Sequence, residues 1–394
     1  MSKINFKEKP PLMFLLVNNL ALINLTWLLI QSIFLNESTI AIGYYVAIII
    51  SGFIGVSLLH KKLILRSNLF CITLVGSLSF VLMSVFKNML IALIALAFTL
   101  GISFGLTTPI YLSIFAIYSE IGKRGRFGGF LLFFTQLYMV TSCILLNLDA
   151  STTLLVMAGL NTINVICLSF YKPFAAQSGN TSSCYCTKNA IKNRAFILYF
   201  VPWFMFCLIN YIEGPILHQF LGREFQTYVL AVSFLVGVSA PLGGFICDLK
   251  GRKMAGILGF VLLGMSYGIL SLFYSVDIVR IFFMVAEGVT WGILYVTFVF
   301  VIWGDISEGD DKEIYYFLGN LPFLLSNVIY FFAEKFKIAE IIAVSASFSV
   351  ASFFIFLAVV PLLYAPETLP ERVIREKELR SYVEKAKRLA EKYS

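Results

Sequence analysis

The sequence predicts an all-α membrane protein in which twelve transmembrane helices form two six-helix bundles. Three observations predict this fold class. Of the 394 residues, 59% are hydrophobic and only 13% are charged, against roughly 25% charged residues in soluble domains. The mean hydropathy is +0.88. Apolar stretches of membrane-spanning length recur along the whole chain, and one polar stretch near the middle divides them six and six.

The apolar stretches are close to or longer than the roughly 20 residues that a helix needs to cross the hydrocarbon core. Lipid offers no partner for backbone N–H and C=O groups, so stretches this long and this apolar should be helices. We expect spans at residues 11–34, 38–59, 66–86, 89–118, 126–148, 151–171, 195–217, 225–247, 254–274, 278–303, 314–332 and 341–364.

The polar segments define the organisation of the chain. Residues 1–171 are the expected N-terminal bundle, 172–194 a cytoplasmic linker rich in Ser, Asn and Lys, and 195–364 the C-terminal bundle. We expect 365–394 to form a cytoplasmic amphipathic helix, because its apolar residues recur at helical spacing and Glu–Arg pairs stand four residues apart. The basic start of the chain resembles a signal peptide, but no small-residue cleavage site follows it, so the first span should be retained.

Basic residues are distributed very unevenly between the two sides of the membrane. An even number of spans places both termini on one side. With the N-terminus in the cytoplasm, 25 of the 30 Lys and Arg residues fall in cytoplasmic segments, as the positive-inside rule requires. The five on the other side are Lys87, Arg223, Arg280, Lys335 and Lys337. Topology thus explains the formal net charge of +8, and no nucleic-acid partner is expected.

Few residues could support catalysis or metal binding. The two His of the chain, His60 and His218, are isolated, and Cys184 and Cys186 form a C-x-C pair without further ligands, which is a weak metal signal. An intramembrane enzyme would need a cluster of His, Asp or Cys at one membrane depth. We therefore expect no enzyme, no cofactor and no metal site.

The two halves of the chain echo each other. Residues 52–62 and 244–253 both open on Gly-Phe-Ile and end on basic residues, although Val56 stands where the second copy has Asp248. Glycines four residues apart occur in the fourth span (Gly101, Gly105) and again in the tenth, and such pairs let helices approach closely. Internal repeats of this kind are typical of secondary transporters, whose substrate site lies between the repeats near the bilayer midplane.

One loop carries a specific motif. The residues Gly244-Phe-Ile-Cys-Asp248-Leu-Lys-Gly251-Arg252-Lys253 match Gly-x-x-x-Asp-x-x-Gly-Arg-Arg/Lys, and on this basis the chain resembles the major facilitator superfamily over roughly residues 10–370. Two shorter patterns, Ser119-Glu120 with its following basic residues and Pro366-Glu367-Thr368, are similar to sugar porters. The fifth span lacks the Gly-Pro pattern of drug/proton exchangers.

This resemblance implies a major facilitator fold and a secondary carrier working by rocker-switch alternating access. The solute would be a small polar organic molecule, sugar-like or another metabolite, crossing the cytoplasmic membrane as a symport or uniport, with coupling to protons left open. The resemblance leaves two alternatives: a drug or metabolite exporter, or a transporter-like sensor that moves nothing. We expect a monomer whose partners are its small-molecule substrate, protons if it is coupled, and the lipid bilayer.

Polar residues inside the spans are the candidates for substrate binding and coupling. A charge in the membrane is costly unless it is paired or hydrated, so Glu287 in the tenth span and Glu213 in the seventh are functional candidates, the alternative being hydrated helix ends. Amides can bind a polar solute or simply join helices, and Trp can form a cavity wall or an interfacial anchor. The candidates are Glu287, Glu213, Asn210, Trp291, Trp27, Asn24, Gln136 and Asn320.

A second set is expected to form an inner gate. In facilitators the loop between the second and third spans meets the loop between the tenth and eleventh spans when the cavity faces outward, so we expect basic Lys61 and Lys62 to pair with acidic Asp310 and Asp311. Asp248 should meet the start of the fifth span near Arg126, where a carboxylate is also favoured at a helix N-terminus. The inner-gate candidates are Gly244, Asp248, Gly251, Arg252, Lys253, Arg126, Lys61, Lys62, Asp310 and Asp311.

Overall fold

A computed structural model describes residues 9–33, 38–56, 66–146, 149–170, 190–307, 312–336 and 343–369 of the chain. In this part the regular structure is helical throughout, with short 3₁₀ turns between some helices and π-helical residues at 55–56 and in η5 (Tyr295–Ile302). The expected linker and the expected tail helix lie largely outside the described residues, so they stay predictions.

The helices follow the predicted spans closely. The first half contains α1 (Lys9–Ile33), α2 (Ser38–Ile54), α4 (Arg66–Val85), α5 (Leu90–Tyr118), α6 (Arg124–Leu146) and α7 (Ala150–Phe170). The second half contains α9 (Arg194–Leu221), α10 (Phe225–Lys250), α11 (Arg252–Phe273), α12 (Asp277–Leu294), α13 (Trp303–Ile306), α14 (Lys312–Lys335), α16 (Val344–Leu357) and α17 (Val359–Tyr364). The tenth span is α12, η5 and α13 in succession, and the twelfth is α16 with α17.

The described helices have the length and composition of membrane spans. Eight segments in the described residues are long and apolar enough to cross a bilayer, and one of these, Arg194–Lys250, contains both α9 and α10. Shorter apolar stretches, Phe14–Thr26 and Thr39–Ile54, belong to α1 and α2. Large apolar side chains point outward, among them Ile91 (84% exposed) and Leu272 (74% exposed). Such surface suits lipid rather than water, and the protein is an integral, multi-pass membrane protein.

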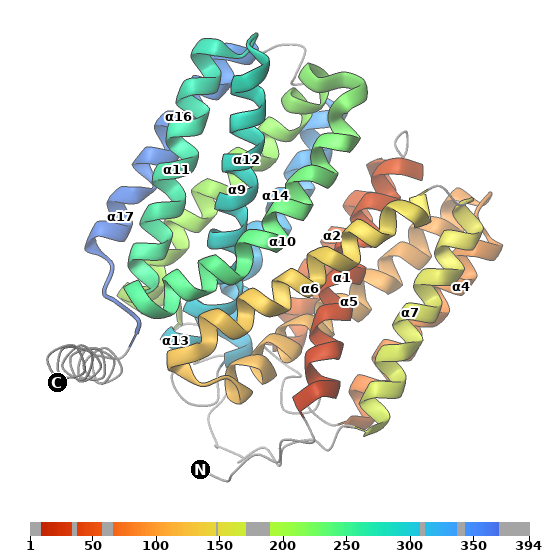
Figure 1. Cartoon of the computed structure of the whole chain (residues 1–394). Helices are drawn as coiled ribbons and strands as arrows, with labels where there is room; N and C mark the ends of the chain where they lie inside the picture. Colours follow the sequence, from red (N-terminus) through yellow and green to blue (C-terminus); the bar gives the residue numbers. More distant parts are fainter. Residues whose placement is uncertain are drawn as a thin grey trace, which may run out of the picture.

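The helices of the two halves lie on opposite sides of a diagonal interface (Figure 1). Helices α6 and α10 run side by side along this interface, and α2 packs against α14 in the same way. Apolar cores fill both halves, and Tyr330 and Phe331 of α14 reach into the core of the first half. The division into bundles at the predicted residue boundaries stays a prediction. We call the end that holds residues 244–253 the motif end.

Glycines allow the closest helix contacts. A Cβ on Gly101 or Gly105 of α5 would collide with backbone carbonyls of α2, and a Cβ on Gly288 or Gly292 of α12 would collide with side chains of α10. The glycine pairs singled out in the fourth and tenth spans therefore do serve close packing, at corresponding places in the two halves.

Candidate functional site

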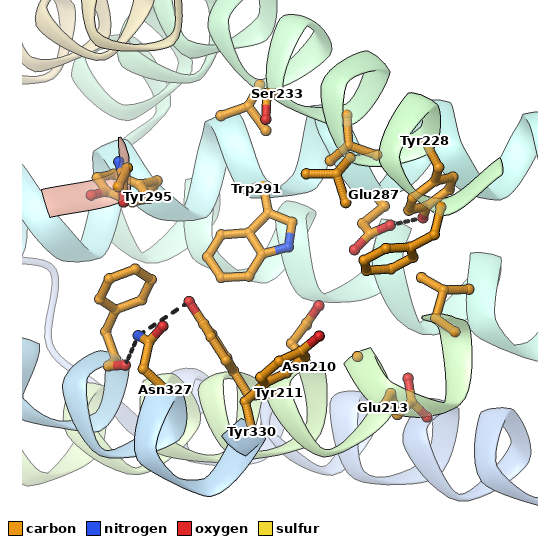
Figure 2. A pocket seen from close by; sticks show the side chains of 18 of the residues that line it. Asn210, Tyr211, Glu213, Tyr228, Ser233, Glu287, Trp291, Tyr295, Asn327 and Tyr330 are labelled. Carbon is orange, nitrogen blue, oxygen red and sulfur yellow. Dashed lines mark hydrogen bonds between the residues drawn. The ribbon is translucent and has the colours of Figure 1, made fainter. Parts of the chain in front are cut away.

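A cavity of about 230 Å³ lies among the helices of the second half and is closed on one side by α1, α2 and α6 of the first half (Figure 2). A single water needs only roughly 10–15 Å³ of such space, so the cavity has room for a small organic molecule. Its polar and ionisable lining side chains are Asn24, Tyr45, Gln136, Asn210, Tyr211, Glu213, Tyr228, Ser233, Tyr267, Glu287, Tyr295, Asn327 and Tyr330.

The structure brings most of the substrate candidates from the sequence to this one cavity. The candidates that line it are Glu287, Glu213, Asn210, Trp291, Asn24 and Gln136. Asn320 is not among the lining residues: its amide donates a 2.9 Å hydrogen bond to the carbonyl oxygen of Tyr316 on its own helix. The side chain of Trp27 lies outside the described part of the chain.

The two candidate carboxylates are buried, and both belong to the cavity lining. Glu287 on α12 is 8% exposed and accepts a hydrogen bond from the hydroxyl of Tyr228 on α10. Glu213 on α9 is 5% exposed, and its Oε1 accepts a 3.4 Å hydrogen bond from Ser347 on α16. Its Oε2 has no hydrogen-bond partner among the described residues.

Helix α9 positions Glu213 in a locally irregular segment. Pro202 and Pro215 lie inside this helix, and each removes one backbone hydrogen bond from the helical ladder. Gly214 faces Tyr330, whose ring would collide with a Cβ at this position. The absence of a side chain at Gly214 therefore lets α14 come close beside the carboxylate.

Aromatic side chains form most of the remaining wall. Trp291 packs edge-on against Phe206 at 4.6 Å and against Tyr211 at 6.5 Å between ring centroids. Tyr211 also contacts Phe323 edge-on at 5.8 Å, and its hydroxyl lies 3.5 Å from the Nδ2 atom of Asn327. The place of these tyrosines in the cavity wall was not predicted from the sequence, because a Tyr in an apolar span has no distinguishing spacing.

The charge of the lining is one-sided. Among the described lining residues, Glu213 and Glu287 carry carboxylates, and none is a Lys, Arg or His. The cavity therefore combines two acids with amides, hydroxyls and aromatic faces. The described residues also contain no group of three or more His, Cys, Asp or Glu that could hold a metal ion.

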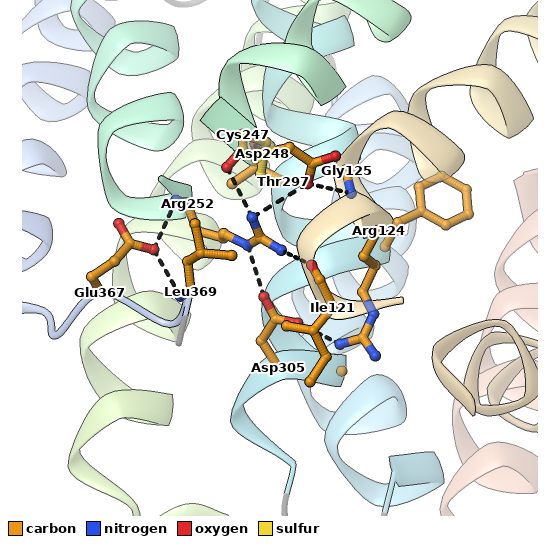
Figure 3. A network of polar contacts seen from close by, with 12 residues as sticks. Ile121, Arg124, Gly125, Cys247, Asp248, Arg252, Thr297, Asp305, Glu367 and Leu369 are labelled. Carbon is orange, nitrogen blue, oxygen red and sulfur yellow. Dashed lines mark hydrogen bonds and ion pairs between the residues drawn. The ribbon is translucent and has the colours of Figure 1, made fainter. Parts of the chain in front are cut away.

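A second cluster of polar residues joins the halves at the motif end (Figure 3). The carboxylate of Asp248 accepts hydrogen bonds from the backbone N–H groups of Gly125 and Arg126, both at 2.9 Å. The Nε of Arg126 lies 3.3 Å from the same carboxylate. The expected contact between Asp248 and the start of the fifth span is thus present, and it has the geometry of a helix N-terminal anion site.

Asp305 is a central residue of this cluster that the sequence analysis did not single out. Its carboxylate binds Arg124 of the first half and, at 2.8 Å, the Nε of Arg252 of the second half. Arg252 also reaches Asp248 at 3.3 Å, and its guanidinium donates to the carbonyl oxygen of Ile121. The side chains of Asp305 and Arg252 are fully buried, so this is an interior charge network rather than a set of surface pairs.

The other half of the expected gate falls outside the described residues. Lys61, Lys62, Asp310 and Asp311 all lie there, so their pairing stays a prediction. A nearby contact is described: Ser113 of α5 donates a 2.8 Å hydrogen bond to Glu313 at the start of α14. This contact also links the two halves at the motif end.

Glu367, which is distant in the sequence, caps the N-terminus of α11. Gly251, the residue before α11, has φ of +100° and no side chain to cap the helix. The carboxylate of Glu367 accepts hydrogen bonds from the N–H groups of Arg252 at 2.9 Å and Lys253 at 3.2 Å. Glu367 of the Pro-Glu-Thr pattern therefore holds the segment that follows α17 against the Gly-Arg-Lys motif.

Replacing Glu367 by Ala should lower the thermal unfolding temperature of the purified protein. The substitution leaves the first N–H groups of α11 without their acceptor, and loss of an N-cap costs about 0.5–2 kcal/mol. Glu367→Gln, which keeps an acceptor oxygen but not the charge, should lose less. Equal stability of Glu367→Ala and the unmodified protein would contradict this capping role.

Comparisons with known proteins identify the fold. No protein-family model matches the sequence, and no curated protein matches it. Solved structures do: the human organic anion transporter MFSD10 (TETRAN) superposes with a TM-score of 0.63 at 14% identity, over 91% of this chain and 100% of that chain. The E. coli fucose:proton symporter FucP gives a TM-score of 0.67 at 11% identity, over 91% and 97%.

A third structure agrees with these two. The proton:xylose symporter XylE, bound to 6-bromo-6-deoxy-D-glucose, superposes with a TM-score of 0.64 at 15% identity, over 91% of this chain and 94% of that chain. XylE is described as a protein of the major facilitator superfamily. The fold class predicted from the sequence is confirmed: this chain has the fold of the major facilitator superfamily transporters.

Proposed function

We propose that this protein is a secondary transporter that moves a small organic solute across the membrane by alternating access. The observation that carries the proposal is the mixed polar and aromatic cavity, which lies among the helices of the second half and is bordered by Asn24, Tyr45 and Gln136 of the first half. Secondary transporters bind substrate at the interface of their repeats, and ligand sites combine apolar walls with a few convergent polar groups. Its role is that of a carrier rather than an enzyme.

In this proposal the cluster at the motif end is the inner gate. Asp248, Arg252 and Asp305 hold the halves together there, through Gly125, Arg126 and Arg124 of the first half. Opening the cavity toward this end requires these contacts to break. The motif end faces the cytoplasm, because the positive-inside rule places the basic loops on that side. The protein acts as a monomer in the cytoplasmic membrane.

A disulfide across this gate tests the mechanism. The Cβ atom that a side chain at Gly128 of α6 would have lies 3.0 Å from the Cβ of Phe300 in η5, slightly under the 3.5–4.5 Å of disulfides. In proteoliposomes, the Gly128→Cys/Phe300→Cys variant should take up solute when reduced and stop when oxidised. Each single Cys variant, oxidised in the same way, is the matched control.

Uptake should first be measured with the unmodified protein, against a panel of labelled sugars, organic acids, amino acids and organic cations. Uptake above that of protein-free liposomes supports transport. A protein that moves no member of the panel, although it is folded and reconstituted, would contradict the proposal and favour the non-transporting sensor. Uptake that continues after the disulfide has formed would contradict the assignment of the gate.

A further inference from the structure

The charge of the cavity restricts the solute more narrowly than its size does. Two carboxylates, Glu213 and Glu287, line the same small cavity, so they repel each other when both are ionised. Repulsion between like charges is strong where water is scarce, and a buried carboxylate without a counterion is costly. A positive charge between them, carried by a proton or a solute, removes this cost.

The cavity supplies no such charge of its own. Tyr228 from α10 and Tyr267 from α11 both lie near the two carboxylates: Tyr228 donates a hydrogen bond to Glu287, and Tyr267 lies beside Glu213 together with the hydroxyl of Ser347. Tyrosine hydroxyls donate hydrogen bonds but do not neutralise a carboxylate. No Lys, Arg or His lines the cavity in the described part of the chain. The counter-charge must therefore come from outside the protein.

Two residues of the lining carry buried polar atoms that are left without hydrogen bonds in the described part of the chain. The Oε2 of Glu213 and the Nδ2 of Asn210 are buried atoms for which the described residues provide no hydrogen-bond partner, and both residues line the cavity. An oxygen acceptor of this kind, left unpartnered on a side chain that is 5% exposed, is costly unless a ligand or water binds it. An ammonium group, which has only donors, satisfies it directly.

Aromatic rings add a second feature that a cation uses. Trp291, Tyr211, Phe323 and Tyr295 stand together as one wall of the cavity. The faces of such rings attract ammonium and quaternary ammonium groups. An anion would meet the repulsion of two carboxylates here, and a neutral sugar would leave their mutual repulsion in place.

We propose that the solute is an organic cation, an amine or a quaternary ammonium compound, which binds between Glu213 and Glu287 in place of a proton. This rests on the proposed transport function and names its substrate class. With the cavity empty, the carboxylates keep a proton. Arrival of the cation releases this proton to the solution, and departure of the cation takes one up again. The protein thus exchanges organic cation for proton through these carboxylates, although its fifth span lacks the Gly-Pro pattern of drug/proton exchangers.

The test uses three probes of the same shape and different charge: phenethylamine, 2-phenylethanol and phenylacetate, with xylose as a sugar. Binding to the purified full-length protein is measured by calorimetry at pH 6 and pH 8, in two buffers of different ionisation enthalpy. We expect phenethylamine to bind, to release protons, and to bind more weakly at pH 6, because protons then compete for the carboxylates. The amine itself stays protonated at both pH values.

Variants assign the effect to the two carboxylates. Glu213→Gln and Glu287→Gln should each weaken phenethylamine binding at least about tenfold and reduce the proton release. Glu224→Gln makes the same chemical change at an exposed residue outside the cavity and should leave both unchanged. Comparison of the thermal unfolding of the variants separates loss of binding from loss of folding.

The outcomes separate the substrate class from the transport function. Binding of 2-phenylethanol, phenylacetate or xylose as tight as that of phenethylamine would overturn the organic-cation proposal, as would failure of phenethylamine, choline and tetraethylammonium alike. In either case the protein could still take up another solute. If the disulfide between residues 128 and 300 stopped that uptake, the proposed transport function would stand. Binding of phenethylamine without proton release would overturn the exchange of cation for proton.

Discussion

Replacing Asp305 by Ala should cause the largest loss of stability of any single charge removal in the described residues. Its carboxylate is fully buried and bound to both Arg124, which is 3% exposed, and Arg252, which is fully buried. Removing one partner of a buried ion pair leaves an uncompensated charge and costs about 3–5 kcal/mol. Thermal unfolding of the purified protein measures the loss.

The two arginines should respond differently to this change. Arg252 keeps Asp248 at 3.3 Å, whereas Arg124 keeps no carboxylate among its hydrogen-bond partners in the described residues, which are then the hydroxyl of Ser119 and the carbonyl oxygen of Ala116. Arg124 belongs to the first half and Asp305 to the second, so the change also removes a contact between the halves. We therefore expect Asp305→Ala to slow disulfide formation between Cys residues placed at 128 and 300.

A matched control is available at the opposite end of the tenth span. Asp277 forms a 3.4 Å pair with Arg280, but its side chain is 88% exposed. Such pairs contribute about 0–1 kcal/mol, so Asp277→Ala should change the unfolding temperature little. Similar losses from the two substitutions would show that the interior network at Asp305 is not a source of stability.

The sequence was most informative about residues whose side chains cost free energy to bury in an apolar span. Glu213 and Glu287 stand out because a carboxylate in an apolar span is rare, and both line the cavity. The motif at residues 244–253 predicted the contact of Asp248 with α6, because the spacing of that motif is specific. Both signals depend on the identity of residues rather than on how the helices are rotated.

Features that depend on helix rotation could not be predicted in this way. Asp305 reads as part of an acidic loop, yet the end of α13 turns it inward between two arginines. Asn18, a polar residue of the first span, bonds to the carbonyl oxygen of Leu160 and to Asn164 and so joins helices of one half. Asn320 bonds to its own helix. The same amide chemistry serves a cavity or a helix contact, and only packing decides which.

The role of a glycine likewise depends on helix packing and could not be predicted from the sequence alone. Gly244 was recognised as a motif residue, but its role depends on Gly125, which lies opposite it on α6. A Cβ at Gly244 would collide with the backbone carbonyl of Gly125, and a Cβ at Gly125 would lie 2.6 Å from the carbonyl oxygen of Gly244. Neither contact can be relieved by a side-chain movement, because both partners are backbone.

Replacing Gly244 by Val should therefore separate α6 from α10 at the motif end. Inserting a side chain into a packed contact costs typically about 1–3 kcal/mol when neighbours can shift, and here only whole helices can shift. The separation would also lengthen the hydrogen bonds from Gly125 and Arg126 to Asp248, which now measure 2.9 Å. We expect lower thermal stability, and disulfide formation between positions 128 and 300 that is at least several-fold slower.

The control for this change is Gly159 on α7, where a Cβ would meet nothing within 4 Å. Gly159→Val adds the same side chain in open space, so it should leave the rate of disulfide formation unchanged. Its effect on stability should be small, since glycine in a helix is itself unfavourable by roughly 0.5–1 kcal/mol relative to alanine. If the disulfide between positions 128 and 300 formed as fast in the Gly244→Val protein as in the Gly159→Val protein, the contact between Gly244 and Gly125 would not hold the gate. The hydrogen bonds of Asp248 and the ion pairs of Asp305 would then have to hold α6 against α10 without it.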